Sequence, residues 1–479
     1  MRLPSLTINP EAKMTQSRRT RSSSSRRRSL PPELQHVNLN AAGIDVGAEA
    51  HFVAVPAGRD PQGQNVRQFG TFTADLYALA DWLAACGVET VAMESTGVYW
   101  IPLFEVLEER GFEVKLVNPR HVKNVPGRKT DVLDCQWLQQ LHTYGLLQAA
   151  FRPEDQICVL RSYLRQREML VRYASHHIQH MQKALEQMNL KLHHVISDLT
   201  GVTGMRILRA IFEGERDPHK LAGLRDHRCK NDEATIALAL EGHWRPEHLF
   251  ALRQAVELFD FYRQQITACD AKIEDCLHTF QDRSAGRPLD KPTRRRNRQK
   301  NQPAFDVRSH LFRITGVDLT AIEGIDAQTA LKLIGEIGLD MSRWPTEKHF
   351  ASWLALSPGS KISGGKTLSA RTKPYPNRAA AAFRLAAHGL HNSHSALGAF
   401  LRRKKAHLGA PKAITATAHK LARLVYAMLK NGSQYVETAE AEYERRYRER
   451  VIHNLKRKAR ALGYDLFQRN VPVLPLAPP

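Results

Sequence analysis

The chain has 479 residues, of which 42% are hydrophobic, and its 70 lysines and arginines against 48 aspartates and glutamates give a formal net charge of +22. This length predicts two or three folded units, because domains usually run to about 100 to 200 residues. No apolar run reaches the roughly 18 residues of a membrane span, and the N-terminus lacks the apolar core of a signal peptide. We therefore expect a soluble protein of the bacterial cytoplasm.

The positive charge indicates a polyanionic partner. Basic residues are dense in the first 30 residues and again in the run "TRRRNRQK", but the remainder of the chain is also positive. Such a balance is typical of proteins that bind nucleic acid, so we expect association with the nucleoid. The alternative is that the basic runs are solvated linkers that only aid solubility.

The cysteines give no sign of a metal or disulfide framework. The six cysteines form no CxxC pair and show no zinc-like spacing with histidine. In a cytosolic protein this pattern predicts reduced and mostly buried thiols.

The N-terminal part predicts an α/β domain. Residues 1–38 are rich in serine and arginine and are expected to form a disordered basic tail. Residues 39–150 alternate between strand and helix patterns. Strands are expected at 42–55, with a glycine bend, and at 65–73, 88–94 and 112–118; helices are expected at 74–87, near 102–111 and from about 130.

Two long helical segments follow, within a region predicted to be a coiled coil over residues 151–281. The first has apolar residues stepping by three and four from Ile157 to Val195, with Arg167 in the seam, and the second runs from Leu252 to Phe280 with Asp270 in the seam. This spacing is typical of paired helices. The pattern leaves open whether they pair within one chain, between chains, or simply pack on their own domain.

The C-terminal part predicts a mainly helical domain at residues 306–435, after a basic linker at 282–305. The segment 319–338, "LTAIEGIDAQTALKLIGEIG", is predicted to be either a helix-hairpin-helix element, whose turn amides hold a DNA phosphate, or an ordinary helical hairpin. The domain has a glycine-rich centre, "SPGSKISGGKT". Residues 436–479 are expected to form a basic helix and a proline-rich tail.

Four acidic residues in the N-terminal domain suggest a metal site. Asp45 lies within a predicted strand, Glu94 ends another, and Asp131 and Asp134 share one face of the opening turn of a helix. Carboxylates that converge in this way repel one another unless a cation joins them, and Mg²⁺ prefers such oxygen ligands. Two ions about 3.5 to 4 Å apart would suit phosphoryl transfer, with Mn²⁺ as an alternative metal.

Each acid also has an ordinary explanation. Asp134 alone is compatible with a solvated helix face, and Asp131 with a helix N-cap. The fragment "GIDVG" also resembles the first phosphate turn of actin-like ATPases. That class needs a second turn of the DxG type, and we find no convincing one.

Together the motifs resemble the transposases of the insertion-sequence-110 family, which includes the Piv-type DNA invertases. The resemblance covers roughly residues 40–435. It rests on "GIDVG", "MESTGVYW", "LVNPRHVKNVPGRKTDVLDCQWL", "LTGVTGMRILRAIFEGERDPHKLAGLRDHRCK" and "LALSPGSKISGGKT", in the expected order.

The resemblance implies a RuvC-like domain of the RNase H fold, a coiled-coil middle and a mainly α C-terminal transposase domain. The family's DEDD acids, which are catalytic and hold the metal, fall on Asp45, Glu94, Asp131 and Asp134. Its nucleophilic serine, followed by glycine, falls on Ser363. Ser357 and Ser360 lie close by in the sequence and stay open as alternatives.

Basic residues flank both motifs and are expected to bind nucleic acid. Those near the acids are Lys123, Arg128 and Lys129, and those near the serine are Lys361, Lys366, Arg371 and Lys373. Positive groups near a scissile phosphate stabilise its charge during transfer. Two prolines in "KPYPN" depart from the family's usual glycine and lysine spacing, which affects the expected geometry of the loop after Lys366.

The resemblance also implies partners and a reaction. DNA would be cut and rejoined through a phosphoserine link, in a homodimer or tetramer that joins the acids of one subunit to the serine of another. A structured bridge RNA would guide it. Two alternatives stay open: a RuvC-type junction-resolving nuclease that uses water, and a nucleic-acid-binding protein without catalysis.

Overall fold

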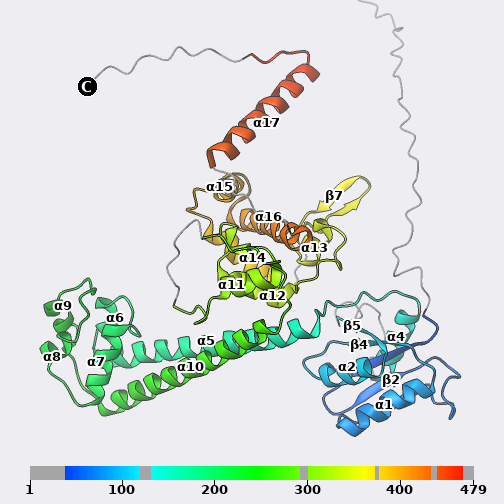
Figure 1. Ribbon diagram of the computed structural model, residues 1–479, viewed down its shortest axis with the longest axis horizontal. Helices are drawn as coiled ribbons and strands as arrows, with labels where there is room; N and C mark the ends of the chain where they lie inside the picture. Colours follow the sequence, from blue (N-terminus) through cyan, green and yellow to red (C-terminus); the bar gives the residue numbers. More distant parts are fainter. Residues whose placement is uncertain (1–37, 119–130, 292–299, 373–376, 433–439, 468–479) are drawn as a thin grey trace, which may run out of the picture. The chain divides into compact units, whose positions relative to one another are not determined.

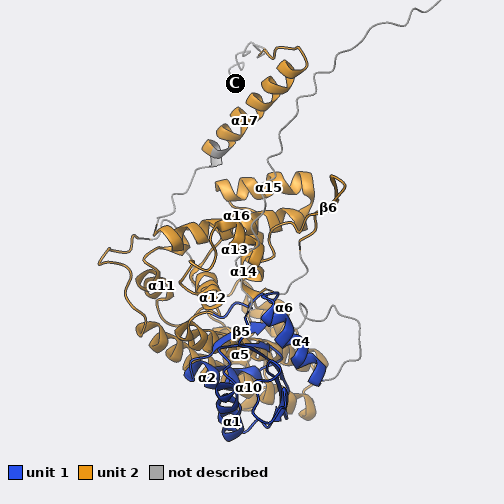
Figure 2. Cartoon of the chain, turned by 90° about the vertical axis from the view of Figure 1, so that its right-hand side faces the viewer, with its two compact units in different colours: residues 1–152 blue, residues 153–479 orange. Residues whose placement is uncertain are grey.

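The computed structural model describes residues 38–118, 131–291, 300–372, 377–432 and 440–467 (Figure 1). The chain divides into two compact units, residues 1–152 and 153–479 (Figure 2). The predicted nucleic-acid-binding residues Lys123, Arg128, Lys129 and Lys373 lie outside the described residues, as do most of the basic tail and part of the basic linker. Within the described residues, no helix is long and apolar enough to cross a membrane.

Unit 1 is built on a mixed five-stranded sheet with the strand order β3-β2-β1-β4-β5. Strands β1, β2 and β3 pair antiparallel, whereas β1, β4 and β5 run parallel. This arrangement is compatible with an RNase H-like domain. The strands are β1 Ala41–Val46, β2 His51–Ala54, β3 Val66–Phe69, β4 Thr90–Glu94 and β5 Glu113–Val117.

The elements of unit 1 follow the predicted order, with one difference at the start. The segment 42–55 forms two antiparallel strands in place of one bent strand, because the chain reverses between Gly47 and Ala50, where the Gly47 amide donates to the Ala50 carbonyl at 3.1 Å. Within residues 38–118 and 131–152, helices pack on this sheet. They are α1 Thr73–Ala85, α2 Trp100–Glu109 and α4 Asp131–Thr143.

The two faces of the sheet carry different helices. On one face the alternate residues of β1 and β4, including Ile44 and Met93, form a buried core with α1 and α2. On the other face Ala92 and Val117 pack against Leu138 of α4. Since side chains alternate along a strand, Gly43 and Asp45 of β1 lie on the α4 face.

Unit 2 begins with a long helical hairpin made of α5 (Asp155–Gln187) and α10 (Pro246–His278). The helices are antiparallel, because the start of α5 meets the end of α10 and the end of α5 meets the start of α10: Gln156 bonds Thr279, and the His243 amide donates to the Met188 carbonyl at 2.8 Å. The predicted pairing therefore occurs within the chain. The predicted seam residues Arg167 and Asp270 form a buried ion pair at its centre.

The first helix ends earlier than its apolar pattern predicts. Met188 caps α5 and Asn189 adopts a left-handed conformation with φ of 55°. The amide of Leu190 then bonds the carbonyl of Leu185 at 2.9 Å, and the amide of Asn189 bonds that of Glu186 at 3.0 Å, which is a Schellman cap. The predicted seam positions Leu192 and Val195 consequently lie on a separate short helix.

Four short helices cover the far end of the helical hairpin. They share an apolar core with α5 and α10 that includes Met181, Leu208 and Leu252 (Figure 1). These helices are α6 Leu192–Val195, α7 Val202–Phe212, α8 Pro218–Ala222 and α9 Glu233–Leu238.

The rest of unit 2 is mainly helical, with one two-stranded sheet. The helices are α11 Val307–Thr315, η2 Leu319–Ala321, α12 Ala327–Ile337, α13 Glu347–Trp353, α14 Arg378–Gly389, α15 Ala396–Leu408, α16 Ala410–Asn431 and α17 Glu440–Ala461; the strands are β6 Lys361–Ser363 and β7 Lys366–Ser369. In the segment 319–338 a single 3₁₀ turn precedes α12, so the helix-hairpin-helix assignment stays a prediction.

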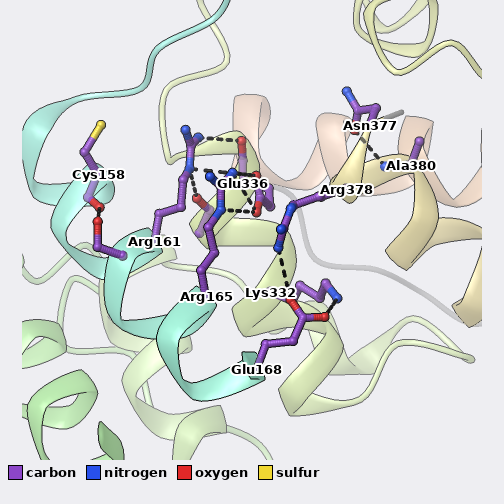
Figure 3. A network of polar contacts seen from close by, with 11 residues as sticks. Cys158, Arg161, Arg165, Glu168, Lys332, Glu336, Asn377, Arg378 and Ala380 are labelled. Carbon is purple, nitrogen blue, oxygen red and sulfur yellow. Dashed lines mark hydrogen bonds and ion pairs between the residues drawn. The ribbon is translucent and has the colours of Figure 1, made fainter. Parts of the chain in front are cut away.

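A polar network joins α5 to the C-terminal helices (Figure 3). Arg161 and Arg165 of α5 point toward Glu336 of α12, where Arg165 Nη2 lies 3.0 Å from Glu336 Oε2. One turn further along α5, Glu168 lies 2.7 Å from Lys332 Nζ of α12 and 3.2 Å from Arg378 Nη1 of α14. These contacts fix the C-terminal helices on the helical hairpin.

Candidate active site

The sheet brings Asp45 and Glu94 to neighbouring positions. Ile44 of β1 pairs with Met93 of β4 in a parallel register, and each acid follows directly in its strand. Both side chains are half-buried. Because parallel strands carry equivalent residues side by side, the two carboxylates lie on the same face at the carboxyl edge of the sheet.

Glycine at position 43 lets α4 cover that face closely. A Cβ atom on Gly43 would lie 2.4 Å from the Cys135 carbonyl oxygen and 2.3 Å from the Gln139 backbone nitrogen. No side chain larger than hydrogen fits at this distance. The backbones of β1 and α4 are therefore in direct contact.

The opening turn of α4 carries Asp131, which is exposed, and Asp134, which is half-buried. Next to them the pKa of the buried Cys135 thiol is raised to about 12, first by its burial and then by the negative charges of Asp45 and Asp134. Carboxylates from both β1 and α4 therefore contribute to the raised pKa of Cys135. The contact of Gly43 with Cys135, and the hydrogen bond from the Asn38 amide to the Thr143 carbonyl at the other end of α4, place Asp45 beside the first turn of α4.

The first turn of α4 suits negative charge. Unpaired amides at a helix N-terminus give it a partial positive charge, which stabilises carboxylates and phosphates. Because β1 runs toward the start of α4, this end of the helix lies at the carboxyl edge of β1 and β4. Asp45 and Glu94 lie at the same edge. The acids predicted from the sequence therefore gather at one edge of one sheet.

This donor set fits a divalent cation. Carboxylate oxygens are the preferred ligands of Mg²⁺, and a cation would offset the mutual repulsion of carboxylates that share one edge of a sheet. The four acids are not drawn tightly together: among the described residues, the groups with three ligand atoms within 4.8 Å of one another are Glu186, His193 and His194, and Glu274, His278 and His310.

The predicted nucleophile Ser363 ends the first strand of an exposed β-hairpin. Ser363 pairs with Lys366 across a turn formed by Gly364 and Gly365, whose φ angles are 55° and 76°. Two successive residues with positive φ make a type I′ turn, which glycine forms without strain. The side chain of Ser363 is exposed beside this turn.

The hairpin presents the predicted basic residues to solvent. Lys361, Lys366 and Arg371 are exposed on it, and the Gly359 amide donates to the Arg371 carbonyl at 2.8 Å, which extends the pairing toward its base. Ser360 is also exposed, whereas Ser357 is half-buried near the start of the ribbon. Ser363 is the serine next to the tight turn.

Sequence reasoning missed this hairpin. The segment was expected to be the glycine-rich centre of a helical domain, yet it forms the β6 and β7 pair. A signal was present, because a Gly-Gly pair flanked by short alternating segments is typical of two-residue β-hairpin turns. The sequence also contained no indication of a second contact, which joins β4 to α4. In it, Thr90 Oγ1 and His142 Nε2 form a hydrogen bond of 2.9 Å.

Two regions of the chain match models of known protein families. Residues 42–190 match a model of DEDD transposases of the IS110 type, described as a transposase, and residues 318–398 match one described as the transposase of the IS116/IS110/IS902 family. In both regions the chain is similar to transposases of the IS110 family. No curated protein matches it.

The two transposase matches indicate an enzyme that acts on DNA in transposition. The first match runs from β1 to the end of α5 and contains all four predicted acids, and the second contains the hairpin with Ser363. The DEDD type of the first match also indicates the use of a divalent metal.

Proposed function

We propose that this chain cuts and rejoins DNA through a serine–DNA link, with Asp45, Glu94, Asp131 and Asp134 holding two Mg²⁺ ions. The observation that carries this proposal is the close contact of Gly43 on β1 with Cys135 and Gln139 on α4, which brings the strand of Asp45 against the helix of Asp131 and Asp134. This concentrates negative charge at one sheet edge, inside a protein of net charge +22 that binds a polyanion.

The acids are the metal ligands in this proposal. They would hold the metal at the carboxyl edge of the sheet, near the first turn of α4, where the helix N-terminus favours a phosphate. Bound Mg²⁺ would stabilise the attacking and leaving oxygens of the transfer. Gly43 contributes indirectly, because it allows α4 to carry Asp131 and Asp134 to this edge.

Ser363 is the proposed nucleophile. Its Oγ attacks phosphorus, the Oγ–P bond forms, one P–O bond to deoxyribose breaks, and the hydroxyl proton leaves to water while the deoxyribose oxygen takes up a proton. In the rejoining step a deoxyribose hydroxyl attacks the phosphoserine and releases the serine. Each exchange conserves the number of phosphodiester bonds, so no nucleotide hydrolysis is required.

The hairpin supports this role by exposure and charge. Ser363 lies beside a two-glycine turn whose residues have no side chain to block a DNA backbone. Lys361 and Lys366 lie on the same ribbon and would stabilise the phosphate charge as it develops.

We further propose the assembly that the family implies. A homo-oligomer, a dimer or tetramer, would join the acids of one subunit to Ser363 of another, and a structured guide RNA would select the DNA. In this scheme residues 39–150 form the RuvC-like domain, 151–281 the coiled coil and 306–435 the serine-bearing domain, with basic segments at 1–38, 282–305 and 436–479.

The acid variants Asp45→Asn, Glu94→Gln, Asp131→Asn and Asp134→Asn test the proposal. Each should abolish strand transfer on the element's ends, in the presence of its flanking RNA and Mg²⁺, while DNA binding persists and Mn²⁺ binding, followed by electron paramagnetic resonance, weakens. The matched control is Glu105→Gln, an exposed acid on α2, which covers the opposite face of the sheet. Wild-type transfer in any acid variant would remove that residue from the site.

A further inference from the structure

A group of potential metal ligands lies in unit 2, apart from the acids of unit 1. Glu274 and His278 come from the last turns of α10, and His310 comes from α11. One ligand atom of each residue lies within 4.8 Å of the other two. Nothing in the transposase reaction proposed above uses these residues.

The spacing of the group suits one small cation. Glu274 and His278 are four residues apart, so they share one face of α10, as paired ligands do in helical zinc motifs. His310 Nε2 lies 3.4 Å from Glu274 Oε1. Metal–nitrogen bonds of about 2.0 to 2.1 Å place neighbouring ligands of a tetrahedron roughly 3.3 Å apart, which is close to this separation.

The two imidazoles also face each other closely. The rings of His278 and His310 lie 4.7 Å apart at an angle of 89°. An imidazole binds a metal through a ring nitrogen, and His310 Nε2 is the ring nitrogen that lies beside Glu274. His278 is exposed, which leaves room for water as a fourth ligand.

The surrounding charges leave the carboxylate available. Within the part of the chain that the structure describes, no lysine or arginine forms an ion pair with Glu274. The guanidinium of Arg313, on α11, donates to the carbonyl oxygens of Leu277 and Phe280 at the end of α10. Glu274 therefore contributes an uncompensated negative charge to the group.

The second group of this kind is less suited to a metal. Glu186 forms an ion pair with Lys191 and a hydrogen bond with His194, and these contacts lower its pKa to about 2. A cation would have to displace the ammonium group from an exposed carboxylate. This group is explained by its own salt bridge.

We propose that Glu274, His278 and His310 bind a transition-metal dication, with Zn²⁺ as the best match. Two imidazoles and one carboxylate are borderline ligands that favour Zn²⁺ over Mg²⁺, and three protein ligands with an open fourth position form a common zinc arrangement. The metal would join the end of α10 to α11, two helices separated in sequence by the basic linker. It would thereby tie the helical hairpin to the C-terminal helices.

Co²⁺ titration of the purified full-length protein tests the proposal, because four-coordinate Co²⁺ absorbs visible light and substitutes for Zn²⁺. The test variants are His278→Ala, whose side chain is exposed and not needed for folding, and Glu274→Gln, which keeps its shape. The controls are His453→Ala, an exposed histidine of α17, and His194→Ala from the second group.

With excess Mg²⁺ present to occupy the acids of unit 1, one equivalent of Co²⁺ should bind the wild type and both controls, and Zn²⁺ should displace it. Both test variants should lose at least about tenfold in affinity together with the visible absorption. Wild-type affinity in His278→Ala and Glu274→Gln would overturn the proposal. So would loss of binding in His194→Ala alone, or prevention of Co²⁺ binding by Mg²⁺.

Discussion

Gly43 of β1 lies directly against Gln139 of α4, because a Cβ atom at position 43 would come within 2.3 Å of the Gln139 backbone nitrogen. This contact sets the distance between the sheet and the helix that carries Asp131 and Asp134. The lack of a side chain at Gly43 thus allows the strand that carries Asp45 to pack closely against the helix that carries Asp131 and Asp134.

Substituting Gly43 by alanine should push α4 away from the sheet. Overpacking of this kind costs about 1 to 3 kcal/mol, and the expected cost is at the upper end because both neighbours are backbone atoms. Hydrogen exchange of residues 131–143 should accelerate, and strand transfer should fall. The control is Gly389→Ala, where a Cβ atom meets nothing within 4 Å. Equal exchange in the two variants would contradict the close contact.

The turn beside Ser363 should tolerate only residues that accept positive φ. Gly364 has φ of 55°, which asparagine adopts readily and valine does not. Gly364→Asn should therefore keep strand transfer, and Gly364→Val should lose it, although both keep Ser363. Because the hairpin is exposed, the thermal unfolding midpoint should change little in either variant. Equal activity in both would show that the turn does not position the serine.

The buried pair of Arg167 and Asp270 should be costly to break on one side. Each residue is 5% exposed, and Arg167 Nη2 also donates to the Asn301 carbonyl at 3.0 Å. Asp270→Ala leaves a buried guanidinium without its carboxylate and should destabilise the protein by about 3 to 5 kcal/mol. The double variant Arg167→Met with Asp270→Leu should recover most of this loss in denaturant unfolding. If the double variant is less stable than the single one, the account of the pair is wrong.

His142 should make unit 1 sensitive to mild acid. Burial, followed by the charge of Lys115, lowers the pKa of His142 from its usual 6.5 to about 4. As the pH falls, His142 takes up a proton near pH 6.5 in the unfolded chain but only near pH 4 in the folded chain. The contribution of neutral His142 to the free energy of unfolding is therefore complete above pH 6.5 and is lost as the pH falls toward 4. The loss is on the order of 3 kcal/mol at most.

The variant His142→Gln isolates this contribution. Glutamine can keep a polar contact with Thr90 Oγ1, which lies 2.9 Å from His142 Nε2, but it does not titrate. Opening free energies from hydrogen exchange of α4 should fall between pH 7 and pH 5 in the wild type and change less in the variant. Parallel pH dependence in the two proteins would show that another group is responsible.

The sequence predicted the strands and helices of unit 1 because their periods are clear and their order is simple. Three elements appear at the expected places: the strand that contains Asp45, the strand that ends at Glu94 and the helix that starts near residue 130. Their packing was not predictable from periodicity. The role of Gly43 depends on the distance between two backbones that lie far apart in the sequence, and the raised pKa of Cys135 depends on charges from two elements.

The predictions for unit 2 were less complete for similar reasons. The apolar repeat correctly identified the seam through Arg167 and Asp270 but continued past Gln187, because a left-handed Asn189 ends the helix without interrupting the apolar pattern. The hairpin of Ser363 is short and exposed, so no buried face signalled its strands. Ligands from α10 and α11 meet only in the folded chain.

The central claim is that Ser363 attacks DNA with the assistance of the acids around α4. The most direct measurement is detection of a covalent protein–DNA adduct on a denaturing gel, using the wild type, Ser363→Ala and Asp45→Asn with the element's ends, its flanking RNA and Mg²⁺. We expect an adduct in the wild type alone, with DNA attached to the peptide that contains Ser363. An adduct in Ser363→Ala, or cut DNA without an adduct in every sample, would contradict the claim.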